Sequence, residues 1–432
     1  MQKFTLTANQ INNQTKQRIS QTKMCKRVIL SVLVIVCCHQ LFYINGQRLL
    51  LETTFIYSFS SSEYNTVQVL SSAIVLQLIP WNIKYINADK ATEYVGKEAY
   101  SKVQVAVIDT GVDYDHEEFR KRVFYINGYP YYYWGKSCIT WGYNVITDEE
   151  GLEAVEDYDG HGTACVGIIA ALNNDVGIIG VAPGINVYVI KRANEATEEL
   201  TEESLNKIIE AIKIAAMGPD GIIGTDDDPE VISMSFGFYI DYPELHNIIK
   251  WAYNKGIVLV AAAGNKPDLG TSFPAKYPEV IAVGSVDENG HPSSFSSPGE
   301  IYAPGENIKT TFKGNGYAIM EGTSFACPHV AATVALMIAE DLKDKKRDLT
   351  PKEIREILIN TAKQVNVNGK TIRIVDAYAA VKAVTSYNSN PSSDPPIISP
   401  YAYSLASSQE DFYENTTKLI VSWSDEYIID PT

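Results

Sequence analysis

Short apolar runs alternate with helical patterns through the middle of this chain of 432 residues. Each run is apolar at most positions and has the length of one strand: residues 103–108, 187–190, 231–235, 257–262 and 280–284. Strands of this kind are buried on both faces of a sheet, and a helix between two of them makes them parallel. The alternation therefore predicts an α/β fold in three layers, with a mostly parallel central sheet and helices on both faces.

Helical patterns fill most of the connections between these runs and continue after the last one. They cover residues 162–171, 202–216, 245–254, 329–341, 351–361 and 376–384. A sheet of this type collects its functional groups at the carboxyl ends of the strands. The polar residues that follow each apolar run are therefore the candidates for a site.

Three polar side chains stand where such groups are expected. Asp109 follows directly on the run 103–108, and Asn265 comes shortly after the run 257–262. His161 lies between two glycines at the start of a predicted helix. Each residue alone also fits a plain structural role, as a turn or capping carboxylate, a turn amide or a core histidine. A carboxylate that ends a buried strand is nevertheless costly unless it is hydrogen-bonded.

Ser324 belongs to a stretch that starts with Gly322 and runs into an apolar helical pattern. The pattern puts Ser324 at or near a helix N-terminus, where unpaired N–H groups and the positive end of the helix dipole favour negative charge. Pro328 is expected in the first helical turn, where its missing N–H costs nothing. A helix-capping serine is the plainer interpretation of the same stretch.

Together the four stretches resemble the subtilisin-like (subtilase) serine peptidases, whose catalytic residues follow in the order Asp, His, Ser. The matching motifs are Val-Ile-Asp-Thr-Gly at 107–111, His-Gly-Thr at 161–163, Ala-Gly-Asn at 263–265 and Gly-Thr-Ser-Phe-Ala at 322–326. The resemblance covers about residues 77–384. Phe325 replaces the Met that is usual in the family, and the segment before the enzyme is shorter than the usual pro-region.

The resemblance implies a role for each of the four polar residues. Ser324 would be the nucleophile, and His161 would take its proton and later give it to the leaving amine. Asp109 would hold the imidazole in one tautomer and stabilise its charged form. Asn265, with the backbone N–H of Ser324, would form the oxyanion hole. The implied activity is that of a serine endopeptidase with protein or peptide substrates.

The resemblance extends to substrate binding. The segment that would pair with an extended substrate is Ser235, Phe236 and Gly237. The residues that would line the first pocket are Ala262, Ala263 and Gly264. Their small size is expected to leave room for a large apolar side chain, while Phe236 and Phe238 add bulk nearby and leave the preference open.

A polar loop after the predicted histidine helix is similar to the tight calcium loop of subtilisins. The ligands that this similarity implies are Gln77, Glu118, Leu172, Asn174, Val176 and Ile178. Leu172, Val176 and Ile178 would offer backbone carbonyls, and Glu118 replaces the more usual Asp. Six or seven oxygens suit Ca²⁺, so the resemblance implies a structural calcium ion. An ordinary hydrated loop is the alternative.

A second stretch with cation-binding composition is the insert 218–228. Its aspartates are Asp220, Asp226, Asp227 and Asp228. It resembles, in shortened form, the calcium loops of some thermophilic archaeal subtilases, and a solvated acidic loop is the alternative.

Cys165 lies four residues after His161 and is expected on the same helix face. Some subtilases have a free cysteine at this place, and the resemblance implies a buried, inert thiol near the triad. A bond to Cys327 is the alternative. The chain has 6 cysteines, and their sparse spacing does not suggest a disulfide framework.

Basic residues precede an apolar run at residues 28–38, the pattern of a secretory signal. We therefore expect a secreted or extracytoplasmic protein, with an uncleaved membrane anchor at the cell surface as the alternative. The predicted organisation is an extension with signal or anchor (1–45), a short pro-region or linker (46–76), a peptidase domain (77–385), a linker (386–400) and an appendage (401–432).

The net charge of −16 argues against nucleic acid or an anionic membrane surface as a partner. A monomer is expected. A catalytically silent binding or scaffold protein is the second hypothesis, but such a protein has no need of all four polar residues. A lipase or esterase of the α/β-hydrolase type would need a Gly-x-Ser-x-Gly elbow and a serine before the histidine, and Ser324 has neither.

Overall fold

The structure is a computed structural model that describes residues 34–44, 47–57, 68–126, 129–196, 200–344, 349–367 and 369–389. The chain divides into two compact units, one of residues 1–42 with 50–74 and one of residues 43–49 with 75–432. Most of a three-stranded sheet with the order β1-β2-β3 belongs to the first unit: β1 (Val34–Ile44), β2 (Gln47–Tyr57) and β3 (Gln68–Leu78).

A ten-stranded sheet forms the centre of the second unit, with the order β16-β17-β13-β12-β11-β10-β4-β9-β7-β8. Its strands are β4 (Gln104–Asp109), β7 (Ile139–Asn144), β8 (Glu149–Glu150), β9 (Asn186–Lys191), β10 (Val231–Met234), β11 (Val258–Ala262), β12 (Val280–Val286), β13 (Ile301–Pro304), β16 (Lys363–Val367) and β17 (Lys370–Ile374). Neighbours from β7 to β17 pair in parallel, and only β8 and β16 at the two edges pair antiparallel. The predicted mostly parallel sheet is confirmed.

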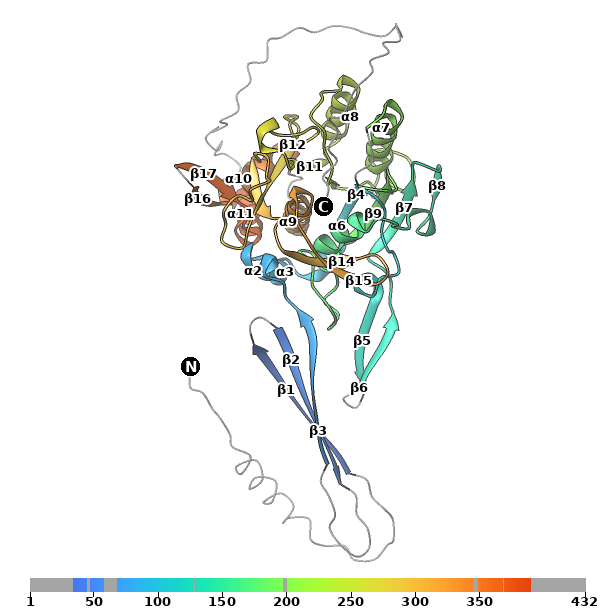
Figure 1. Cartoon of the computed structure of the whole chain (residues 1–432), viewed down its shortest axis with the longest axis vertical. Helices are drawn as coiled ribbons and strands as arrows, with labels where there is room; N and C mark the ends of the chain where they lie inside the picture. Colours follow the sequence, from blue (N-terminus) through green and yellow to red (C-terminus); the bar gives the residue numbers. More distant parts are fainter. Residues whose placement is uncertain are drawn as a thin grey trace, which may run out of the picture. The chain divides into compact units, whose positions relative to one another are not determined.

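Helices cover both faces of this sheet (Figure 1). The principal ones are α6 (His161–Ala170), α7 (Glu202–Met217), α8 (Pro243–Asn254), α9 (Thr323–Asp344), α10 (Pro351–Thr361) and α11 (Ala377–Ser389). In β4, Val105 and Val107 pack into one apolar cluster with α6 and α9, while Ala106 and Ile108 pack into another with α7 and α8. Because alternate side chains of a strand point to opposite faces, the two clusters lie on opposite sides of the sheet. The three-layer fold is confirmed.

Two of the helices begin at capping boxes that the sequence encodes. Thr201 caps α7, accepting a bond from the Ser204 N–H at 3.1 Å. Thr350 caps α10 in the same way, and Pro351 follows as the first helical residue. Such caps satisfy N–H groups that the helix itself leaves unpaired. They fix where each helix starts relative to the sheet.

Helix α9 runs through the middle of the apolar layer that it shares with α6. Among the described residues it is the one helix long and apolar enough to cross a membrane, yet 83% of its most apolar window is buried inside the protein. It begins at Thr323, six residues before the predicted start at 329. Pro328 therefore lies inside the helix, and its predicted place in the first turn is wrong.

Several elements differ from the expectations for the two ends of the chain. Strand β2 and most of β3 lie in the segment 46–76, for which the sequence predicts only a short pro-region or linker. The last residues of the apolar run 28–38 belong to β1, and the rest of that run is outside the described residues. Helix α11 extends to Ser389, past the predicted domain end at 385. The appendage 401–432 is outside the described residues.

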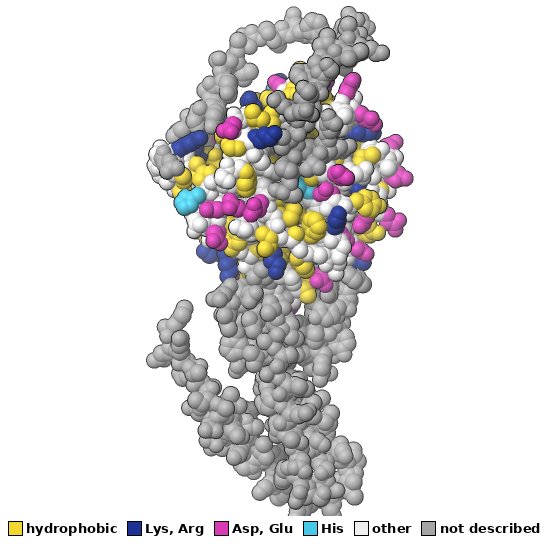
Figure 2. Space-filling model, in the orientation of Figure 1, with side chains coloured by type: hydrophobic (Ala, Val, Ile, Leu, Met, Phe, Trp, Pro, Cys, Tyr) yellow, Lys and Arg dark blue, Asp and Glu magenta, His cyan; other side chains and the backbone are white. Residues whose placement is uncertain are grey.

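The remaining elements are short, and several of them pack on the helices that cover the main sheet. The helices are α2 (Trp81–Tyr85), α3 (Ala88–Val95), α4 (Lys97–Tyr100) and α5 (Glu117–Arg120), with single 3-10 turns at Glu153–Val155 and Pro267–Leu269. The hairpins are β5 (Lys121–Ile126) with β6 (Tyr129–Trp134) and β14 (Ile308–Phe312) with β15 (Gly316–Met320). On the face shown in Figure 2, acidic side chains are interspersed with apolar ones, in keeping with a net charge of −16.

Candidate active site

Asp109 and His161 form a buried pair at the carboxyl edge of the central sheet. Asp109 ends β4, and His161 is the first residue of α6. His161 Nδ1 and Asp109 Oδ1 are 2.8 Å apart, with 3% and 2% of the two side chains exposed. The helix approaches the aspartate loop so closely that a Cβ at Gly162 would lie 2.2 Å from the Gly111 carbonyl oxygen. The glycine at 162 is therefore what allows the pair to form.

The electrostatics of this pair follow from its burial. Burial raises the pKa of the Asp109 carboxyl, but attraction to His161 and Arg192 outweighs it and holds that pKa below its usual value. Burial lowers the pKa of His161, but Asp109 outweighs that effect and holds the imidazole pKa well above its usual value. The carboxylate therefore fixes the proton on Nδ1. Nε2 is left buried and has no hydrogen-bond partner among the described residues.

Asp157 ties the two halves of this pair together, and the sequence analysis missed it. Its Oδ1 accepts the Thr110 hydroxyl at 3.0 Å and the Gly160 N–H at 2.9 Å. Its Oδ2 accepts the Thr163 N–H at 2.9 Å and the Thr163 hydroxyl at 2.6 Å. One buried carboxylate thus accepts hydrogen bonds from Thr110, which follows Asp109, and from Gly160 and Thr163, which flank His161 and Gly162. Only its place two residues before Asp159 in the histidine motif could have pointed to it.

Ser324 is the second residue of α9, as the sequence predicts for a serine at a helix start. Its hydroxyl donates to the Ser235 carbonyl oxygen at 3.1 Å. Pro328 has no N–H to give the Ser324 carbonyl, so this oxygen lacks its helical partner. The Ser235 hydroxyl donates to it at 2.7 Å and the Cys165 thiol at 3.6 Å. Because of Pro328, the Ser324 carbonyl can bond to Ser235, which follows β10, and to Cys165 in the histidine helix α6.

His161 and Ser324 lie near each other through these shared neighbours. Cys165 Sγ is 3.9 Å from His161 Nδ1 and contacts the Ser324 carbonyl. The ring of Phe325, the residue after Ser324, lies 5.2 Å from the imidazole, centroid to centroid. The described geometry therefore brings Asp109, His161 and Ser324 together.

Asn265 is oriented by the residue before the serine. Its Oδ1 accepts both the N–H and the hydroxyl of Thr323, each at 3.0 Å. The Nδ2 group therefore points away from Thr323 and remains available as a donor. A surface hollow of about 480 Å³ opens beside this amide. It is lined by Asn265, Lys266, Pro267, Asp268 and Leu269.

The two predicted substrate segments are neighbours, because β10 and β11 pair in parallel. Residues 235–237 continue β10, and residues 262–264 end and follow β11. Phe236 and Phe238 are each 1% exposed and belong to the apolar cluster under α7 and α8. Arg192 stacks 4.6 Å above the Phe236 ring. The idea that the two phenylalanines add bulk beside the first pocket is therefore wrong, because the core takes their side chains.

The residues of the predicted calcium loop converge on one buried point. Gln77 Nε2 lies 2.6 Å from each of the Leu172 and Ile178 carbonyl oxygens and 3.4 Å from Asn174 Oδ1. Glu118 Oε1 accepts the Ile178 N–H at 2.7 Å. Val176 donates its N–H to Asn174 Oδ1 at 3.2 Å.

This donor set fits a hard cation. Glu118 is fully buried, and burial raises the pKa of its carboxyl to about 8. In the part of the chain that the structure describes, its Oε2 has no hydrogen-bond partner. An uncompensated buried carboxylate oxygen beside converging carbonyls is the environment that a bound cation would satisfy. Turning the Gln77 amide by half a turn would add Oε1 to the same centre.

The acidic insert folds into a compact turn with bonds within itself. The Asp220 N–H donates to Asp227 Oδ2 at 3.0 Å, and the Thr225 hydroxyl donates to Asp227 Oδ1 at 2.6 Å. Asp228 accepts the Gly224 N–H, while its Oδ1 is buried without a partner. Both the cation loop and the plain acidic turn are compatible with these contacts, so the second calcium loop stays a prediction.

Cys165 is expected to resist alkylation in the folded protein. The side chain is fully buried, and burial together with Asp109 raises the pKa of the thiol to about 11. Iodoacetamide at about pH 8 should leave Cys165 unmodified in the native state and alkylate it after denaturation, as read by mass spectrometry. Cys138 and Cys327 are buried as well, are not in disulfides, and serve as internal controls. Native carbamidomethylation of Cys165 alone would contradict the burial.

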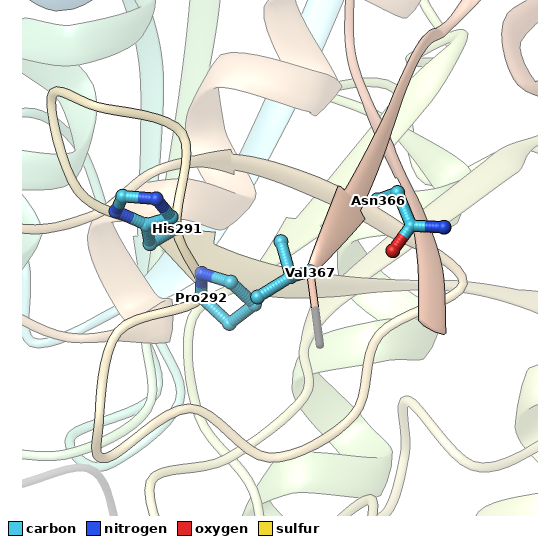
Figure 3. Close-up of a pocket in the computed structure, with 4 residues that line it drawn as sticks. All are labelled: His291, Pro292, Asn366 and Val367. Atoms are coloured by element: carbon cyan, nitrogen blue, oxygen red, sulfur yellow. The ribbon is translucent and has the colours of Figure 1, made fainter. Parts of the chain in front are cut away.

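A pocket of about 460 Å³ lies elsewhere in the unit, between the β12–β13 connection and β16 (Figure 3). Its lining residues are His291, Pro292, Asn366 and Val367. His291 is 64% exposed and lies 3.6 Å from Asp287. With one exposed imidazole and no nucleophile among these four residues, this pocket does not form a second catalytic constellation.

Comparison with known proteins agrees with the geometry. The profile of the Subtilase family matches residues 100–380, a range that includes Asp109, His161, Asn265 and Ser324. A thermostable alkaline protease of Halalkalibacterium halodurans is 34% identical over 293 residues, which are 67% of this chain and 69% of that protein. Subtilisin DY of Bacillus licheniformis is 35% identical over 293 residues, 66% of this chain and 92% of that protein. The major intracellular serine protease of Bacillus subtilis is 34% identical over 307 residues, 67% of this chain and 86% of that protein.

Proposed function

This chain belongs to the subtilase family of serine endopeptidases, and from that premise we propose that Asp109, His161 and Ser324 are its catalytic triad. The observation that carries the proposal is the buried 2.8 Å contact between Asp109 and His161, which leaves Nε2 as an unpaired base near Ser324. Protein or peptide substrates follow from the family.

In the proposed mechanism, the Ser324 hydroxyl first exchanges its bond to the Ser235 carbonyl for one to His161 Nε2. Nε2 takes the proton as the oxygen attacks the scissile carbonyl carbon, and Asp109 stabilises the resulting imidazolium. The imidazolium then gives its proton to the leaving amine, which leaves an acyl-enzyme. Water, deprotonated by Nε2, hydrolyses the ester and restores Ser324.

Asn265 would stabilise the negative charge that develops on the substrate carbonyl oxygen. Its amide is held at Oδ1 by Thr323, so the Nδ2 donor is already oriented before substrate arrives. The backbone N–H of Ser324, at the start of α9, would be the second donor. Preorganised donors act strongly because no reorganisation is needed during the reaction.

An extended substrate would lie along residues 235–237 and 262–264. Gly237 and Gly264 keep both segments free of Cβ atoms that would meet their neighbours at 2.3 and 2.6 Å. Backbone pairing of this kind supplies affinity with little side-chain selectivity, and pockets add the preference.

We propose a structural calcium ion held by Gln77, Glu118, Leu172, Asn174, Val176 and Ile178. The proposal is supported by the orphaned Glu118 Oε2 and by the two carbonyls 2.6 Å from the Gln77 amide. The ion would join Gln77, at the start of the peptidase domain, to the loop after α6. It would take no part in the bond cleavage.

An extracytoplasmic location is the proposed site of action. It rests on the basic residues before the apolar run 28–38 and on a calcium site that suits calcium-rich surroundings. Two of the relatives are named as intracellular proteases, so the relatives alone do not decide the location. Sequencing the N-terminus of the mature protein from the culture medium would test export, and a protein that stays with the cytosol would contradict it.

The active-site assignment can be tested with a fluorophosphonate, which phosphonylates an activated serine. Mass spectrometry of the digested protein should find the adduct on Ser324 and on no other serine. Prior denaturation should abolish the reaction, because activation depends on His161 and the oxyanion donors. An adduct elsewhere, or none in a protein that hydrolyses casein, would overturn the assignment.

A further inference from the structure

Two hydroxyl groups lie in the space that the proposed substrate segments, residues 235–237 and 262–264, face. A Cβ at Gly237 would lie 2.3 Å from Ser272 Oγ. A Cβ at Gly264 would lie 2.6 Å from the phenolic oxygen of Tyr239 and 3.0 Å from the same Ser272 Oγ. The two glycines therefore face one common space, and Ser272 and Tyr239 occupy it. No sequence motif marks either residue.

Hydrogen bonds hold these hydroxyls against the pocket wall. The Lys266 N–H donates to the Tyr239 oxygen at 3.0 Å, and the Ser297 hydroxyl lies 3.3 Å from it. Ser272 donates its N–H to the Ala263 carbonyl at 2.9 Å and its hydroxyl to the Ala262 carbonyl at 3.4 Å. Each bond ends on or beside residues 262–266. Tyr239 and Ser272 are thus hydrogen-bonded to residues 262–266, which include the segment proposed to bind the substrate.

A large side chain in this space would have to displace the phenol. The displacement would break the bond from the Lys266 N–H and separate the Tyr239 and Ser297 hydroxyls. Leaving such groups unpaired in a substrate-filled pocket costs free energy that a small side chain does not incur. Gly, Ala or Ser requires no displacement, and a serine side chain adds a hydroxyl that can join the network.

We infer that Tyr239 and Ser272 determine specificity by closing the pocket for the residue before the scissile bond. The enzyme then cleaves after Gly, Ala and Ser in preference to Leu or Phe. This preference is the opposite of the one for large apolar residues that the small residues 262–264 alone would suggest. This inference rests on the proposed function, because it takes residues 235–237 and 262–264 as the substrate site.

The test uses peptide p-nitroanilides that differ only in the residue before the scissile bond: Ala, Ser, Leu or Phe. For the wild-type enzyme, kcat/KM should favour Ala over Phe by about tenfold or more. Tyr239→Ala should shift that ratio towards Phe by about 10- to 200-fold, because it removes the whole phenol. Tyr239→Phe keeps the ring but removes the hydroxyl and its bonds to Lys266 and Ser297, so it should shift the ratio towards Phe by a smaller factor than Tyr239→Ala.

Ser272→Ala provides a second variant should Tyr239→Ala fail to fold, and it should shift the ratio towards larger residues by a smaller factor. Fluorophosphonate labelling of each variant reports whether the active site has formed. A labelled wild-type enzyme that prefers Phe or Leu would overturn the inference and leave the triad assignment standing. So would a labelled Tyr239→Ala variant with the wild-type ratio. A wild-type protein that neither labels nor cleaves any of the peptides would overturn the proposed function and this inference with it.

Discussion

Ser324→Ala is expected to lower kcat for peptide hydrolysis by about 10⁶-fold, the magnitude that removal of the serine causes in subtilisin itself. The hydroxyl is the atom that forms the acyl-enzyme. The Cys165 thiol, which contacts both His161 and the Ser324 carbonyl, places this serine near the imidazole. The variant should fold normally, because alanine fits in the space of serine and keeps the backbone of α9, while the lost hydroxyl bond to the Ser235 carbonyl is a single contact in a large core. Initial rates on a chromogenic peptide and the circular dichroism spectrum measure the two effects.

His161→Ala should lose about as much activity as Ser324→Ala, and the double variant should lose no more than either. The two residues act as one unit, so their effects are far from additive. Ser101→Ala is a suitable control, because Ser101 is exposed and its hydroxyl bonds only the nearby Glu98 carbonyl. If Ser324→Ala kept more than a hundredth of the wild-type kcat, or if the two losses multiplied in the double variant, the triad would be wrong.

The central strands could be predicted from sequence because they are buried on both faces. Strands β4, β10, β11 and β12 appear as continuous apolar runs, with all or nearly all positions buried in the fold. Strand β16 alternates between half-buried and exposed positions, and β15 is mostly half-buried. Such short, partly exposed hairpins have no continuous apolar run to mark them, so their sequences resemble those of loops.

The start of α9 shows how a rule based on local sequence can predict the wrong first residue of a helix. Proline is common in the first helical turn, so Pro328 suggested a helix starting nearby. The helix instead begins at Thr323, and the carbonyl that Pro328 leaves without an N–H partner is taken by the Ser235 hydroxyl. That compensation comes from a residue 89 positions away, and no local pattern reveals it.

In the candidate site, too, some residues could be predicted from the sequence and others could not. Asp109, His161 and Asn265 could be identified because they follow strands or start a helix, where a parallel sheet exposes its functional groups. Asp157, Tyr239 and Ser272 act through contacts made across loops, such as the Tyr239 hydroxyl to the Lys266 N–H. Their sequence neighbourhoods carry no periodic signal, so only the folded chain brings them to the site.

Removal of calcium is expected to produce the largest change in stability. An ion that binds only the folded chain, present at 1,000 times its Kd, adds about 4 kcal/mol to the free energy of unfolding. For a domain of about 300 residues the chelator EDTA should then lower Tm by about 6 °C. The Glu118 carboxylate makes the effect strong, because without a cation its Oε2 is buried and unpartnered.

Paired variants separate this site from the acidic insert. Glu118→Gln with Asn174→Ala should remove most of the difference in Tm between calcium and EDTA, because both changes remove oxygen charge or oxygen ligands from the point where the Leu172 and Ile178 carbonyls converge. Asp226→Asn with Asp228→Asn should keep that difference and lower the bound calcium by one ion per chain, as counted by atomic spectroscopy, if the insert binds a second ion. An unchanged count would leave the insert as a solvated turn. A wild-type Tm that does not respond to EDTA, or a Glu118 variant that responds as fully as the wild type, would show that the converging oxygens do not hold the stabilising ion.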